Sequence, residues 1–216
     1  MKFTLKVKTS DASIQKKILE EMRSQIRSKM GTIQLPLQEA IKDYISLSIK
    51  NSNFYNNFMT GKLKTQLGVV DTSLSMSQII DALKSTVVIT VGQIAIYGGS
   101  QIKCIITIQA VPDDFQAALS VPMAQYLTDK GEIIPWLSWV LFEGSSPVVL
   151  DYEMVFGKSE FSRTQDAIMR TKPGQKWRIP SEFRGTAHTN FIYRALNDNI
   201  PELEKILDDL LSGVFK

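Results

Sequence analysis

The sequence predicts an α+β fold in which an antiparallel β-sheet packs against N-terminal and C-terminal amphipathic helices. Apolar residues recur at helical spacing near both ends of the chain, and β-branched runs separated by glycines fill the middle. Those runs lie too close together for the crossover helices of a parallel sheet. With 216 residues, 44% hydrophobic and 22% charged, we expect a single domain over 1–216 with a basic loop insertion at about 158–190.

The N-terminal part predicts one strand and two helices. Residues 1–8 alternate apolar and polar side chains, which is typical of a strand. From residue 11 onward, apolar residues recur every fourth position, which predicts a helix that Gly31 ends. A second helix is expected to begin after Pro36 and to end at the Asn-rich stretch 51–57.

The middle of the chain predicts antiparallel strands, arranged as a meander or another antiparallel pattern. The strands are expected at residues 86–91, 94–97 and 102–110. Residues 113–128 are compatible with helix or loop. Further along, the pattern indicates an aromatic helix, a strand and two terminal helices, at residues 136–142, 148–156, 191–197 and 201–213.

Composition argues against several classes of function. The net charge of +3 indicates no strong affinity for nucleic acid or membranes. One cysteine, Cys104, cannot form an internal disulfide, which suggests a reducing compartment. Together with the single histidine, His188, it is too little for a zinc site, so we expect no metal and no cofactor. The most apolar stretch, 133–142, is about half a membrane span, so we expect a soluble protein.

The sequence offers one enzymatic alternative. Asp151 and Glu153 lie two residues apart on an expected strand, where alternation places them on one face, and Lys158 follows. Two carboxylates and a lysine suit a metal-dependent nuclease. However, apolar side chains occupy the other face of this strand, which is typical of an ordinary half-solvated strand. We therefore expect no catalytic residues.

Residues 158–190 carry all of the excess positive charge. Interleaved aromatics, including Phe161 and Phe183, would suit stacking on single-stranded nucleic acid. The basic side chains would bind either DNA phosphates or an acidic neighbouring protein, or would simply be solvated. These partner-facing candidates are Lys158, Arg163, Arg170, Lys172, Lys176, Arg178 and Arg184.

Three tryptophans are candidate interface anchors. Trp136 and Trp139 lie at helical spacing, so they form either an interface anchor or a core stripe. Trp177 lies within the basic segment, where it either holds the segment onto the body or docks on a neighbour.

Three ordered motifs resemble the tail-completion, or head–tail joining (neck), proteins of tailed phages. They are Thr60-Gly61-Lys62-Leu63, the aromatic helix 136–142 followed by Glu143-Gly144-Ser145, and the helix that starts at Phe191 and holds Ala195-Leu196. The chain departs from the family pattern in the order Phe142-Glu143 and in Arg194, where a proline is usual. A tail terminator or another tail structural protein is therefore an alternative.

The resemblance implies a structural virion protein, assembled in the host cytoplasm, that forms a ring, commonly of six subunits, around the DNA channel. It implies no catalysis and no cofactor. The implied partners are further copies of the chain, portal, adaptor or neck proteins, the tail terminator or tail tube and sheath proteins, and DNA in the channel. A nucleic-acid-binding protein and a metal-dependent nuclease are the rival classes. We also expect the 158–190 segment to become ordered on docking to the next ring or the tail.

Overall fold

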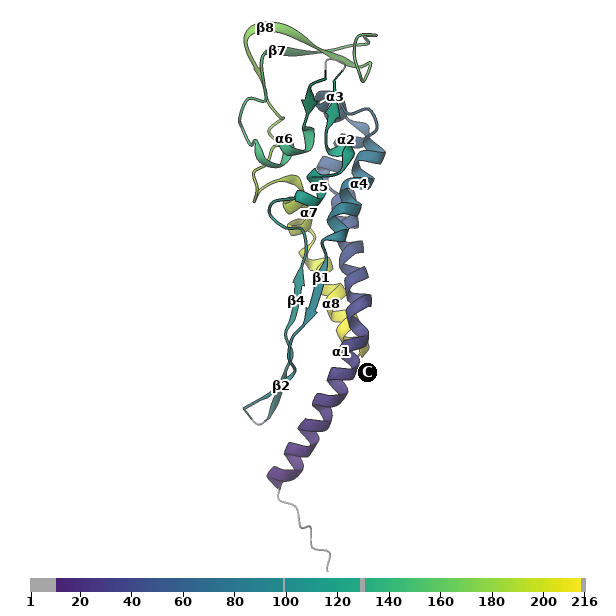
Figure 1. The fold of residues 1–216 in the computed structure, drawn as a ribbon, viewed down its shortest axis with the longest axis vertical. Coiled ribbons are helices and arrows are strands. Elements are labelled where there is room, and N and C mark those ends of the chain that lie inside the picture. Colours follow the sequence, from purple (N-terminus) through teal and green to yellow (C-terminus); the bar gives the residue numbers. More distant parts are fainter. Residues whose placement is uncertain (1–10, 99, 129–130, 215–216) are drawn as a thin grey trace, which may run out of the picture. The chain divides into compact units, whose positions relative to one another are not determined.

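The computed structural model describes residues 11–98, 100–128 and 131–214. Over these residues the chain has an α+β fold, with 52% helix, 18% strand in small antiparallel sheets, and helices at both ends (Figure 1). The fold class predicted from the sequence is confirmed. The strand expected at residues 1–8 lies outside the described residues.

The chain divides into two compact units. Unit 1 comprises residues 1–40, 88–109 and 206–216, and unit 2 comprises residues 41–87 and 110–205. The first helix, α1 (Asp11–Lys50), and the last, α8 (Ile200–Val214), each contribute residues to both units.

Unit 1 combines helical residues with a two-stranded ribbon. β1 (Val88–Val91) pairs with β4 (Ile106–Gln109), and β2 (Ala95–Tyr97) pairs with β3 (Gln101–Lys103), both antiparallel. The pairing is nested, so the middle strands form one long interrupted hairpin and not a meander. Its apolar side packs on helical residues in a cluster formed by Met30, Ile33, Ile94, Ile26, Val91, Ile102, Cys104, Ile106, Leu210 and Leu211.

α1 is one continuous helix of 40 residues, so the predicted helix end at Gly31 is wrong. Gly31 and Pro36 both lie inside it. A glycine in a helix costs about 1 kcal/mol and a proline about 3 kcal/mol. Full burial of one large apolar side chain stabilises by about 1.5–3 kcal/mol. Because the helix buries a long series of such side chains, among them Met30, Ile33 and Ile45, burial outweighs both costs.

Unit 2 contains most of the shorter elements. They are α2 (Asn53–Thr60), α3 (Leu63–Leu67), α4 (Thr72–Ser85), α5 (Gln116–Leu119), the 3-10 helix η1 (Pro122–Ala124), β5 (Tyr126–Leu127), β6 (Ile133–Ile134), α6 (Trp136–Phe142), β7 (Val149–Phe156), β8 (Ala167–Trp177) and α7 (Phe191–Asp198). The segment 113–128, left open between helix and loop, thus contains α5, η1 and β5 in turn.

Stacked aromatic rings form the centre of unit 2. The Phe58 ring stacks on Trp136 with 4.9 Å between centroids, and Phe54 stacks on Phe191 at 3.8 Å. The Trp136 indole is 1% exposed and donates a hydrogen bond to the Met123 carbonyl at 2.8 Å. Of the two roles expected for Trp136, interface anchor or core residue, its burial therefore supports the core residue.

The expectation that residues 158–190 form a loop that orders only on docking is wrong for residues 167–177. These residues form β8 and pair with β7 within the chain itself. Pro173-Gly174 reads as a turn in the sequence. In the structure, this dipeptide lies in an irregularity, where the register passes from Leu150–Lys176 to Tyr152–Thr171. The strand thus accommodates a proline at a break in its ladder, as strands commonly do.

Replacing Gly31 by alanine tests the continuity of α1. Nothing lies within 4 Å of an added Cβ, so Gly31→Ala should raise the free energy of unfolding by about 0.5–1 kcal/mol. Gly68→Ala is the matched control, because Gly68 has φ +70° and an added Cβ would collide with the Tyr126 hydroxyl. Urea unfolding should show Gly68→Ala destabilised; a destabilised Gly31→Ala would instead support a helix end at Gly31.

Candidate functional site

The hairpin formed by β7 and β8 is a largely exposed part of unit 2. The strands pair from Val149–Trp177 to Phe156–Ala167, and residues 157–166 connect them. Most of their side chains are exposed on both faces of the hairpin. The backbones of the two strands pair with each other, while side chains on both faces of the hairpin stay accessible to a partner.

Two tryptophans hold the base of the hairpin to the helical part of unit 2. The ring centroids of Trp139 and Trp177 lie 6.5 Å apart, and both side chains are half-buried. The Val148 N–H donates to the Trp177 carbonyl at 2.9 Å, which closes the same end of the ladder. Of the two roles considered for Trp177, the contact with Trp139 fits attachment to the body.

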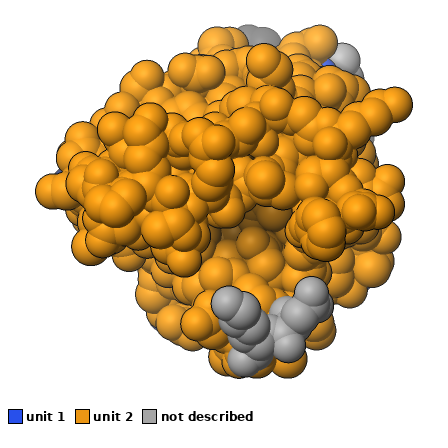
Figure 2. Space-filling view, turned by 90° about the horizontal axis from the view of Figure 1, so that it is seen from above, with its two compact units in different colours: residues 1–40, 88–109, 206–216 blue, residues 41–87, 110–205 orange. Residues whose placement is uncertain are grey.

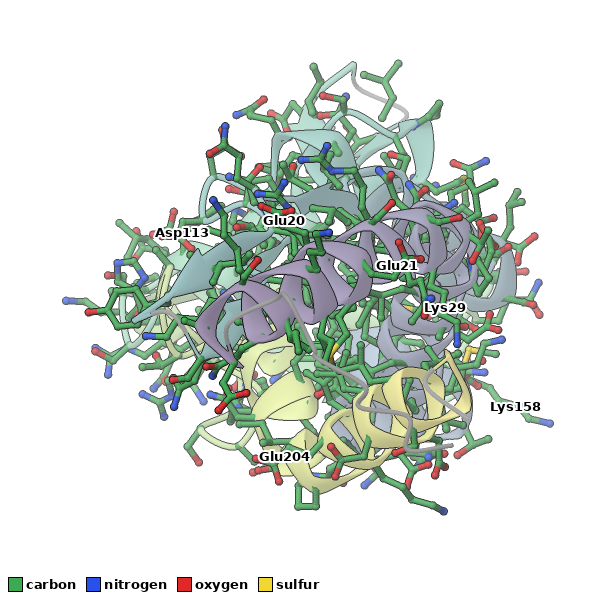
Figure 3. All side chains as sticks on the ribbon, turned by 90° about the horizontal axis from the view of Figure 1, so that it is seen from below. Glu20, Glu21, Lys29, Asp113, Lys158 and Glu204 are labelled. Carbon is green, nitrogen blue, oxygen red and sulfur yellow. The ribbon has the colours of Figure 1, made fainter. Side chains whose placement is uncertain are left out.

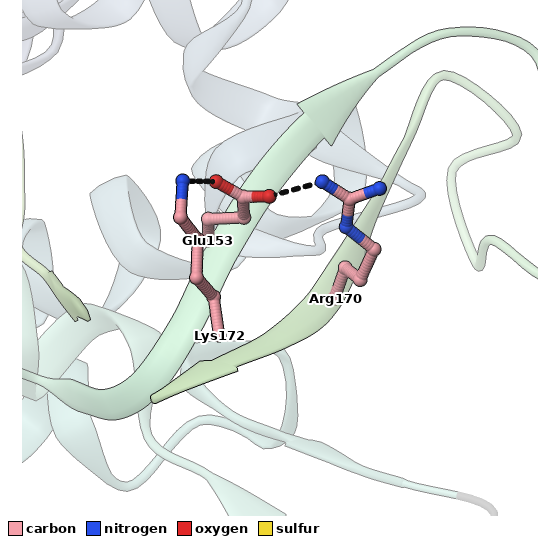
Figure 4. Close-up of polar contacts among 3 residues, drawn as sticks. All are labelled: Glu153, Arg170 and Lys172. Carbon is pink, nitrogen blue, oxygen red and sulfur yellow. Dashed lines mark hydrogen bonds and ion pairs between the residues drawn. The ribbon is translucent and has the colours of Figure 1, made fainter. Parts of the chain in front are cut away.

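A charged triad crosses one face of the hairpin (Figure 4). Arg170 donates to one oxygen of Glu153, and Lys172 Nζ donates to the other at 2.6 Å. The hydrogen bond from Lys172, followed by the one from Arg170, lowers the pKa of Glu153 below its ordinary value. Two of the seven predicted partner-facing cations therefore bind a carboxylate of the same hairpin.

The carboxylates proposed for a nuclease have different partners. Asp151 has φ +61° at the break in the ladder, which interrupts the strand alternation that the sequence implied. Its Oδ1 accepts a hydrogen bond from the Gly174 N–H at 2.8 Å, whereas both oxygens of Glu153 bind cations. Within residues 11–98, 100–128 and 131–214, no group of three or more His, Cys, Asp or Glu side chains is placed to hold a metal ion.

The other predicted cations are dispersed. The Arg163 guanidinium lies 4.0 Å from the centroid of the Tyr126 ring and donates to the Leu127 carbonyl at 2.9 Å. Arg184 is half-buried, and its Nε is enclosed without a hydrogen-bond partner. Arg163 is itself exposed, and so are Lys176, Arg178 and Lys158, whose side chain points away from the body in Figure 3. Phe183 is 4% exposed, so it belongs to the core and not to a stacking surface.

A hollow of about 520 Å³ lies beside the hairpin, and Figure 2 shows the hollowed face of unit 2. The end of α3, Tyr126, the connection 157–166 and the hairpin methionines line it. Gly68 is required on its wall, because a larger side chain would collide with the Tyr126 hydroxyl. Its lining of rings, thioethers and hydroxyls suits an apolar side chain with a polar tip.

Exposed apolar side chains lie on segments that line or adjoin this hollow. Phe161 in the connection is 88% exposed, and the cross-strand neighbours Leu127 and Ile133 are 61% and 60% exposed. The Arg163 hydrogen bond to Leu127 joins the connection to this strand pair. We call Phe161, Leu127 and Ile133 the apolar patch. A sequence pattern does not reveal it, because the exposure depends on how β5 and β6 pair.

The polar contact nearest the lone histidine has an ordinary structural role. The Tyr193 hydroxyl donates to an Asp113 carboxylate oxygen, and the centroid of the exposed His188 ring lies 6.4 Å from that of Tyr193. Desolvation, followed by the hydrogen bond with Asp113, raises the pKa of Tyr193 to about 12. The phenol therefore stays protonated near neutral pH and acts as a hydrogen-bond donor, not as a base.

No family model, curated protein or solved structure matches the chain. In addition, no helix among the described residues is both long and apolar enough to cross a membrane.

Glu153→Gln tests whether the triad stabilises the hairpin. A carboxyl with a lowered pKa stabilises the fold above its unfolded pKa, and the effect disappears as the pH falls through the lowered value. We therefore expect Glu153→Gln to lower the melting temperature at pH 7. The difference from wild type should shrink once the pH falls below about 4.3, the ordinary glutamate pKa, and disappear as the pH passes through the lowered pKa of Glu153. Thermal melts across this range measure it, with the exposed Glu160→Gln as the control. A difference that persists in acid contradicts the triad's role.

Proposed function

We propose that this chain is a structural virion protein of a tailed phage, a ring-forming neck or tail-completion subunit that joins head and tail around the DNA channel. The ordered motifs at residues 60–63, 136–145 and 191–196 suggest the family. The function proposed is to hold larger partners together, with no chemical step.

The observation that carries the proposal is that the hairpin, its connection and the β5–β6 pair of unit 2 all carry exposed apolar side chains. Phe161, Leu127 and Ile133 form the apolar patch, and Tyr152 and Phe156 on the hairpin are 39% and 44% exposed. Exposed apolar residues that lie together mark interaction surfaces more often than scattered ones do. The patch borders a hollow, so a partner can both cover Phe161 and insert a side chain.

The local pairing of charges supports the same proposal. Glu153 binds Arg170 and Lys172 on the hairpin, and Arg163 binds Tyr126 and Leu127. Catalytic sites direct polar groups toward one reacting atom. Here Glu153 binds its two cations across the hairpin, and Arg163 joins the connection to β5, so these groups bind neighbours at separate places. A tail terminator would use the same kind of surface.

DNA binding is the second candidate, and exposed Lys158, Lys176 and Arg178 favour it. With three phosphate contacts, the logarithm of the binding constant should fall with the logarithm of the salt concentration at a slope of about −2.7. Gel-shift titrations at several salt concentrations measure this slope. A slope of that size, which becomes shallower and reaches about −1.8 in the Lys176→Gln variant, would favour DNA in the channel as a direct partner.

Phe161→Ser is the central test of the proposed surface. Since Phe161 is almost fully exposed, the free energy of unfolding should change by less than about 0.5 kcal/mol, and the melting temperature should change little. Joining of heads and tails in a reconstitution assay should fall at least tenfold, as expected for loss of an aromatic anchor. Ile200→Ser, also an exposed apolar residue of unit 2, is the control. Full joining activity in Phe161→Ser would exclude this patch as the docking surface.

A further inference from the structure

The first part of α1 presents an apolar stripe that is only partly covered. Ile14, Ile18 and Met22 recur every fourth residue and are 39%, 54% and 48% exposed. The same stripe continues to Ile26 and Met30, which pack in the cluster of unit 1. The exposed apolar residues thus continue the helix face that is buried further along α1, which is typical of an amphipathic helix that packs against a second helix or sheet.

The two sides of the stripe differ. On one side, Leu19 is 9% exposed, so residues of the same chain already cover this side. The other side carries Lys17 and Glu21, one helical turn apart and both exposed. Glu21 accepts a hydrogen bond from Gln25 at 3.1 Å and is labelled on this part of α1 in Figure 3. A helix that carries an acidic and a basic residue along its own edge would therefore complement this flank.

We propose that this stripe binds the same stripe of a second copy of the chain, with the two helices antiparallel and Ile18 at the centre. In this arrangement Ile14 lies opposite Met22 of the second copy. The same flank of both helices meets in reversed order, so Lys17 faces Glu21 of the second copy, and two equivalent ion pairs form. The charges on this flank thus make the helix complementary to a second copy of itself.

A parallel pair does not fit. In a parallel pair, the flank with Lys17 and Glu21 would lie against the Leu19 side of the second helix, which is covered already. The antiparallel pair brings the two open flanks together and leaves both covered sides undisturbed.

The pairing goes beyond the proposed function. A two-fold contact closes after two copies, so it cannot by itself build a ring. It is a separate association surface on unit 1, whereas the docking surface proposed above lies on unit 2.

Charge reversal tests the pairing on the full chain. Lys17→Glu or Glu21→Lys alone turns two attractions into repulsions and should weaken the dimer about tenfold, because exposed pairs contribute about 0.2–1 kcal/mol each. The Lys17→Glu/Glu21→Lys double variant restores opposite charges and should recover most of the affinity. Sedimentation velocity over a concentration series measures each dissociation constant. Unchanged dimerisation in both single variants would overturn the proposal.

Cross-linking tests the register. With Cys104→Ser to remove the native thiol, Ile18→Cys places two cysteines at the centre of the pair, and a short bis-maleimide should link them into a covalent dimer. Leu35→Cys is the control, because Leu35 is 71% exposed on the same helix but lies off the stripe. Equal linking in both variants, or a chain that stays monomeric at every concentration, would overturn the pairing. A dimer that persists in Ile18→Asp would overturn it too. Rings that persist in this variant while the dimer is lost would agree with the pairing and leave the proposed function intact.

Discussion

Burial along one helix, α1, is the interaction on which both units depend. Met30 and Ile33 lie in the cluster of unit 1, while Ile41, Ile45 and Ile49 are buried residues of unit 2. The continuous burial of one face lets the helix pass through Gly31 and Pro36 without ending. Because the ribbon of unit 1 packs its apolar side in the same cluster, its strands have a fixed face and a fixed register.

On unit 2, contacts within the hairpin determine what is left for a partner. Trp177 meets Trp139 at the base, and Glu153 binds two cations across the strands. These contacts use tryptophan and charged side chains that the sequence suggests for partners. Apolar side chains next to the hollow stay exposed instead, led by Phe161. The available surface is therefore more apolar and less basic than the composition of residues 158–190 indicates.

The sequence predicts the elements that have clear boundaries and a clear period. The aromatic helix at 136–142 is predicted to the residue, because Pro135 and Gly144 limit an apolar run. The predictions from the sequence are wrong where tertiary contacts override local signals. The sequence pattern predicts a helix end at Gly31, but packing of the buried face keeps α1 helical through this residue. Pro173-Gly174 suggests a loop, but β7 supplies a partner strand on both sides of the break.

The candidate site was predicted only in part, for a related reason. Composition locates charge along the chain, but it cannot tell which cations find a partner across a hairpin. Trp136 and Trp139 have the same spacing signal, yet one is fully buried and the other half-buried. Which aromatic is exposed depends on the packing of distant segments, and a single sequence does not encode this in any short motif.

A density map of an intact phage particle that contains this chain tests the central claim most directly. The account predicts copies of the chain arranged as a ring between head and tail, with the 149–177 hairpin and Phe161 covered by a neighbouring protein. Particles that lack the chain, or a ring in which Phe161 faces open solvent, would contradict it.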